Sequence, residues 1–60
     1  MPKDPNVLFS YINMKLRDTY PSLDELCASE GCKREDIEKI LHSAGFFYDE
    51  SSNRFAAKQL

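Results

Sequence analysis

Residues 22–45, SLDELCASEGCKREDIEKILHSAG, contain two short amphipathic helical patterns on either side of a glycine-containing turn. Ser22, with Glu25 three positions later, forms a capping-box pattern, which predicts the start of a helix. Gly31 supplies the left-handed backbone conformation that commonly ends a helix. We therefore expect helices at about 23–30 and 34–44.

The spacing within this stretch resembles a helix-turn-helix. That pattern has a small residue on its first helix, a glycine four positions later, and apolar residues six and nine positions after the glycine. Here those places hold Cys27, Gly31, Ile37 and Ile40. A small side chain lets the helices approach, glycine permits the tight turn, and the two isoleucines anchor the second helix. The pattern is more specific for the fold than for DNA binding.

A further helix is predicted at about 5–19. Asp4 is a suitable N-cap, and a proline at the first helical position is well tolerated. The apolar residues recur at helical spacing in an unusually broad stripe. We expect the rest of the chain to cover this stripe. The alternative is a self-association face that includes Leu8, Tyr11 and Met14.

After the helix predicted at 34–44 the period of the sequence changes. An aromatic run, a turn-rich stretch and a short return predict a β-hairpin at about 46–56. Because an isolated hairpin is marginal in water, its aromatic side chains must dock on the helices. Residues 57–60 are expected to fray.

The whole chain is thus expected to be a single, mainly α domain, residues 1–60: a three-helix, helix-turn-helix-like bundle followed by a short C-terminal β-hairpin. Sixty residues permit one domain and no deep substrate cleft. The predicted core consists of Leu8, Phe9, Ile12, Leu16, Leu23, Leu26, Ile37, Ile40, Leu41, Phe46 and Phe55.

The charge balance bears on the class of partner. Eight Lys and Arg residues against ten Asp and Glu residues give a net charge of −2. This total counts against duplex binding, although it leaves room for a local basic patch. The sequence has neither a signal-peptide pattern nor an apolar run long enough to span a membrane, so we expect a cytoplasmic location.

No pattern of catalytic or metal-binding residues is found. Cys27 and Cys32 are interpreted as small packing residues, because their spacing matches neither a redox pair nor a common zinc site. His42 has no identifiable nucleophile or orienting carboxylate. We therefore expect no enzyme activity, no cofactor, no metal and no small-molecule substrate.

Two functions remain open. The favoured one is a non-enzymatic protein-interaction module whose partner is another protein or a second copy of the chain. The alternative is a DNA-binding regulator. The exposed face of the helix at 34–44, together with the residue before it, carries three basic and three acidic residues. Their charges cancel, which disfavours DNA binding. Its candidate contacts are Lys33, Arg34, Lys39 and Arg54.

Four strings also carry a family resemblance: PKDPN at 2–6, SYINMKLRD at 10–18, SLDEL at 22–26 and GFFYDESSNRF at 45–55. Together they resemble a small bacterial family catalogued as a domain of unknown function, number 4250 in that series. The resemblance implies a stand-alone cytoplasmic bacterial protein. Since the family has no assigned activity, it implies no functional residues.

Overall fold

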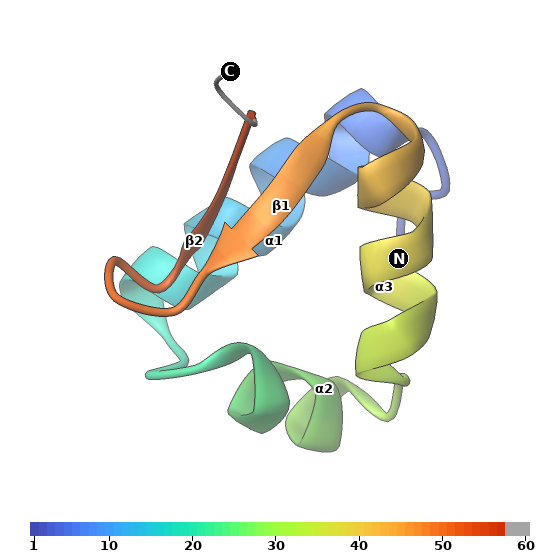
Figure 1. The fold of residues 1–60 in the computed structure, drawn as a ribbon. Helices are drawn as coiled ribbons and strands as arrows, with labels where there is room; N and C mark the ends of the chain where they lie inside the picture. Colours follow the sequence, from blue (N-terminus) through green and yellow to red (C-terminus); the bar gives the residue numbers. More distant parts are fainter. Residues whose placement is uncertain (58–60) are drawn as a thin grey trace.

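The computed structural model describes residues 1–57 and consists of three helices followed by an antiparallel β-hairpin (Figure 1). This arrangement confirms the predicted fold class. The elements are α1 (Pro5–Asp18), α2 (Leu23–Glu30), α3 (Arg34–Ser43), β1 (Phe46–Asp49) and β2 (Arg54–Ala57).

The hairpin packs against two helices, with β2 next to α1 and β1 next to α3. Figure 1 shows the hairpin lying along α1, while α2 lies at the bottom of the view, below the hairpin. Phe55 of β2 is fully buried and is the largest side chain to be so. The hairpin therefore completes the hydrophobic core, which agrees with the prediction that its aromatic side chains dock on the helices.

Helix α1 begins where the sequence predicts. The Asp4 carboxylate accepts hydrogen bonds from the backbone N–H groups of Asn6 and Val7, at 2.8 and 3.4 Å, and Pro5 occupies the first helical position. The helix ends at Asp18, one residue before the predicted end. Three of the apolar residues along its inner face are completely or almost completely buried: Leu8, Ile12 and Leu16.

The turn between α2 and α3 uses the predicted residues. Ser22 Oγ accepts a hydrogen bond from the Glu25 N–H at 3.2 Å, which starts α2. Gly31 has a φ of 72° and ends that helix. The backbone N–H of Cys32 then donates to the Cys27 carbonyl at 3.0 Å, closing the turn. Helix α3 also ends one residue before its predicted end.

The hairpin pairs Phe46 with Ala57 at its open end and Asp49 with Arg54 beside the turn. The prediction that residues 57–60 fray is wrong for Ala57, because this residue pairs within β2. Residues 58–60 lie outside the described part of the chain.

The core matches the prediction at eight of eleven positions. Phe9, Ile40 and Phe46 are instead only partly buried at its margin, where the Phe9 and Phe46 rings stack at 4.0 Å between centroids. These three residues lie on α1, α3 and the start of the hairpin, at the edge of the core, where solvent still reaches part of each side chain. Cys27 takes a core position, as its interpretation as a packing residue requires.

The burial of Leu8 decides between its two interpretations. Its side chain has no exposed surface, which confirms its place in the predicted core and leaves it out of the alternative self-association face. The physical reason is that α3 and the hairpin cover the inner face of α1. No helix within residues 1–57 combines the length and apolar character needed to cross a membrane.

Candidate functional site

Arg34, a candidate DNA contact, is engaged by the protein itself. Its guanidinium lies 3.3 Å from an Asp24 oxygen, 3.1 Å from a Glu38 oxygen and 3.5 Å from a Glu50 oxygen. It also lies over the Tyr48 ring, 5.1 Å from the centroid. Arg34 thus ties α2, α3 and the hairpin together, and three carboxylates offset its charge.

The other candidate cations occupy two different regions. Lys33 and Lys39 are exposed at the start and on the surface of α3, whose first turn carries Glu35 and Asp36. Arg54 lies on β2 and lines a groove to which neither lysine contributes. The structure therefore does not bring all four predicted nucleic-acid contacts to one site.

Tyr11 and Met14, the other members of the alternative self-association face, differ in environment. Tyr11 is partly buried, and its hydroxyl donates to Glu30 at 3.3 Å. Partial burial and the negative charge of Glu30 raise the pKa of Tyr11. Tyr20 donates to the same carboxylate at 3.1 Å, so both tyrosines join α1 and its end to α2. Met14 is 43% exposed and is available to a partner.

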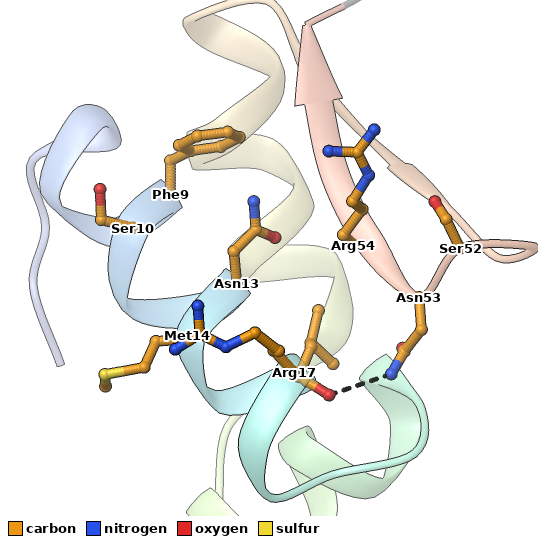
Figure 2. A pocket seen from close by; sticks show the side chains of 9 residues that line it. Phe9, Ser10, Asn13, Met14, Arg17, Ser52, Asn53 and Arg54 are labelled. Atoms are coloured by element: carbon orange, nitrogen blue, oxygen red, sulfur yellow. Dashed lines mark hydrogen bonds between the residues drawn. The ribbon is translucent and has the colours of Figure 1, made fainter.

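A groove of about 630 Å³ lies between α1 and the start of β2. We call it the α1–β2 groove. Figure 2 shows its side chains, with α1 on one side and the turn and β2 on the other. It is lined by Phe9, Ser10, Asn13, Met14, Leu16, Arg17, Ser52, Asn53 and Arg54.

The side chain of Asn13 holds the middle of the groove together. Its Oδ1 accepts from the Phe55 N–H at 2.8 Å, and its Nδ2 donates to the Phe55 carbonyl at 2.9 Å. One carboxamide therefore satisfies both backbone groups of a strand residue. These bonds fix β2 against α1 in a defined register.

Asn53 holds the turn end of the groove in a similar way. Its Nδ2 donates to the carbonyls of Leu16 and Tyr20 at 3.2 and 3.1 Å, which caps the end of α1. The dashed line in Figure 2 marks the first of these bonds. Its Oδ1 accepts from the Tyr48 hydroxyl at 2.6 Å. Asn53 has a φ of 52°, a conformation that asparagine tolerates better than most residues.

Two polar groups in the groove remain without a hydrogen bond or ion pair within residues 1–57: the guanidinium of Arg54 and the hydroxyl of Ser10. Asp49 lies opposite Arg54 in the strand register. Its carboxylate instead accepts from Ser51 and Ser52 in the turn, at 2.7 to 3.0 Å. These bonds lower the pKa of Asp49.

Arg17 is the second cation of the groove. It pairs with its neighbour Asp18 through bonds of 2.9 and 3.1 Å. Both side chains are largely exposed, at 75% and 54%. Such a pair is weak and open to competition from an incoming carboxylate. Among the described residues, the groove therefore offers one arginine without a partner and one in a weak, exposed ion pair.

Sequence reasoning selected Arg54 but missed Asn13, Asn53 and Arg17. A signal for Asn13 was present: it follows Phe9 by four positions and precedes Leu16 by three, so helical spacing places it at the edge of the apolar stripe. A carboxamide in that place needs a polar partner. No comparable signal identifies the carbonyl groups that Asn53 caps.

Chemistry elsewhere in the described region is limited. Burial and the neighbouring Cys32 thiol raise the pKa of Cys27 to about 12, which keeps it protonated at neutral pH. His42 is exposed and stacks on Phe47 at 4.6 Å between centroids. Residues 1–57 contain no group of three or more His, Cys, Asp or Glu side chains that could hold a metal ion.

Comparison with known proteins places the chain in a family. No curated protein and no solved structure matches it. The family model described as a domain of unknown function (DUF4250) matches residues 2–55, which include α1, α2, α3, β1 and the first half of β2. The chain therefore belongs to the DUF4250 family.

Proposed function

We propose that this protein is a non-enzymatic interaction module that binds a partner protein in the α1–β2 groove. One observation carries the proposal: the guanidinium of Arg54, which has no hydrogen bond or ion pair within residues 1–57, lies in the same groove as Phe9 and the exposed Met14. Arginine, aromatic residues and methionine are enriched where proteins bind one another. The cytoplasmic location expected from the sequence is part of the proposal.

The groove is also held in shape before any partner arrives. Asn13 and Asn53 fix its two walls through backbone hydrogen bonds. A partner therefore does not have to order these walls, which lowers the entropic cost of association.

DNA binding is supported less well than protein binding. The α3 surface combines Lys33 and Lys39 with Glu35 and Asp36, and the charge of Arg34 is shared among three carboxylates. A duplex presents a dense row of phosphates, which acidic side chains on the same surface repel. No observation on α3 offsets this repulsion.

A symmetric homodimer through the groove is also less favourable. In such a dimer the same surface of both copies meets across a two-fold axis. Each groove would then face another that carries the same two arginines, Arg17 and Arg54. A different protein with complementary charge avoids this repulsion.

The experiment is a quantitative capture from the lysate of cells that contain the protein. Wild type, Arg54→Glu and Lys39→Glu are immobilised at equal density, and retained proteins are measured by mass spectrometry. Lys39→Glu is the matched control, since it makes the same charge change on an exposed part of α3. We expect a partner that wild type and Lys39→Glu retain and Arg54→Glu loses.

Two results would contradict the proposal. One is the absence of any protein retained above the level of an unrelated immobilised domain. The other is equal retention by wild type and Arg54→Glu. Circular dichroism of the variants shows whether each remains folded, and sedimentation velocity of the wild type measures self-association separately.

A further inference from the structure

We infer that the α1–β2 groove binds a short peptide segment in which an acidic side chain is adjacent to an apolar one. The carboxylate pairs with Arg54, and the apolar side chain packs on Phe9 and Met14. The inference rests on the proposed function, because it specifies the chemistry of the partner at the same site.

The charge of the groove selects a carboxylate. The planar guanidinium of Arg54 presents parallel N–H donors that match the two oxygens of a carboxylate. None of these donors is used within residues 1–57. Asp49, the acidic residue opposite it in the hairpin, is held by Ser51 and Ser52. No carboxylate within residues 1–57 forms an ion pair with Arg54, so a carboxylate of a ligand can take that place.

Arg17 provides a second place for negative charge. Its exposed pair with Asp18 can exchange for a carboxylate of the ligand at little cost. Arg17 also borders a smaller hollow of about 300 Å³ around the end of α1, which shares Leu16, Arg17 and Asn53 with the groove. The two hollows adjoin, so the surface suits an extended segment with more than one acidic residue.

The apolar part of the groove selects against a simple polyanion. The Phe9 ring stacks on the Phe46 ring, and this contact restricts its orientation. Met14 is 43% exposed and has a flexible thioether side chain that adapts to different apolar shapes. A peptide segment supplies both apolar and acidic groups, whereas a nucleic-acid strand presents regular phosphates that need several cations.

The test is an NMR titration of the ¹⁵N-labelled full chain. The probe is the capped peptide acetyl-Leu-Glu-Leu-Glu-Leu-amide, and its matched control has glutamine in place of each glutamate. We expect shifts of the backbone amides of Phe9, Met14 and Arg54 with the glutamate peptide. The glutamine peptide should bind about fivefold more weakly, the loss associated with an exposed charge pair.

Variants and salt assign the interaction to the groove. Arg54→Ala should weaken binding of the glutamate peptide about fivefold, while Lys39→Ala should leave it unchanged. Met14→Ser should weaken binding of both peptides. Raising the salt concentration should reduce the difference between the two peptides, because it screens the charge pair.

Several results would overturn the inference: no shifts up to about 1 mM peptide, equal binding of the two peptides, or shifts confined to α3. A single-stranded oligothymidine that shifts the groove amides at lower concentration than the peptide would identify a polyanion site instead. If capture of a protein from lysate depends on Arg54 but the acidic peptide does not bind, the proposed interaction module is supported and only the inferred ligand is wrong. If neither depends on Arg54, both proposals fail.

Discussion

The carboxamide of Asn13 pairs with both the N–H and the carbonyl of Phe55, at 2.8 and 2.9 Å, across 42 positions of the chain. This contact joins the first helix to the last strand. It fixes the position of the side chain that fills the centre of the core, since Phe55 is fully buried. The same contact forms the middle of the candidate groove.

Asn13→Ala is expected to lower the free energy of unfolding by about 2 to 3 kcal/mol, because two partly buried backbone groups lose their partner. Ser10→Ala, on the same helix but without such a bond, should change stability by less than about 0.5 kcal/mol. Urea unfolding followed by circular dichroism measures both. Equal stability of the two variants would contradict the role assigned to Asn13.

Phe55→Leu is expected to destabilise the protein by about 1 to 2 kcal/mol, since it leaves unfilled volume in the core. This milder change is preferable to alanine, because a domain of this size has little stability to lose. Phe47→Leu, at a position that is 37% exposed, is the comparison and should cost less. A larger loss at Phe47 than at Phe55 would place the core elsewhere.

Arg34→Ala is expected to lower the free energy of unfolding by about 1 kcal/mol, because it removes contacts with α2, α3 and the hairpin together. Lys39→Ala should have little effect. The difference between the two variants should shrink as salt rises, since salt screens partly exposed ion pairs. Denaturation at low and high salt checks this, and a salt-independent difference would assign the loss to packing alone.

The hairpin turn is expected to make stability depend on pH through Asp49. Its hydrogen bonds from Ser51 and Ser52 lower its pKa in the folded state below the unfolded value of about 3.9. The carboxylate therefore stabilises the fold above that pH, and this contribution is lost as the pH falls through the folded-state pKa.

An NMR titration of the Asp49 carboxyl carbon measures this shift. Ser52→Ala removes one donor and should move the pKa upward toward its ordinary value, whereas Ser10→Ala should leave it in place. Asp49→Asn should make the acid loss of stability less steep. A normal Asp49 pKa in the wild type would exclude this role.

Cys27 is expected to resist alkylation in the folded protein. Its pKa is raised to about 12, so only a very small fraction of molecules carries the reactive thiolate at pH 7.5. Cys32, which is only partly buried, should react first. Mass spectrometry of Cys32→Ser and Cys27→Ser after timed exposure to iodoacetamide compares the two thiols. Equal rates under native conditions would contradict the assigned environment of Cys27.

The helices were predictable because local rules define them. Asp4 and Pro5 set the start of α1, Ser22 sets the start of α2, and Gly31 ends it, each through bonds or dihedral angles formed within a few residues. The predicted ends of α1 and α3 are each one residue too far along the chain. Local rules miss this because a helix end also depends on contacts with neighbouring segments. The end of α1 is capped by Asn53, from the hairpin turn.

The partly buried aromatic residues show where sequence patterns fail. Helical spacing places Phe9 on the apolar stripe of α1, but it does not show how far the stripe is covered. Only the packing of the hairpin and α3 leaves Phe9 at the margin, stacked on Phe46. The same packing covers Leu8 completely and removes it from the surface.

The sequence by itself determined the three helices, the glycine turn between α2 and α3, and the presence of a hairpin, because periodicity and capping act over short separations in the chain. The tertiary structure decided which polar residues are structural and which are free. It engaged Arg34 with three carboxylates, used Asn13 and Asn53 to hold the hairpin, and left Arg54 unpaired within residues 1–57. Apart from the Arg34–Glu38 pair, which lies within α3, these roles depend on partners 10 to 42 positions away, and such contacts exist only once the chain has folded.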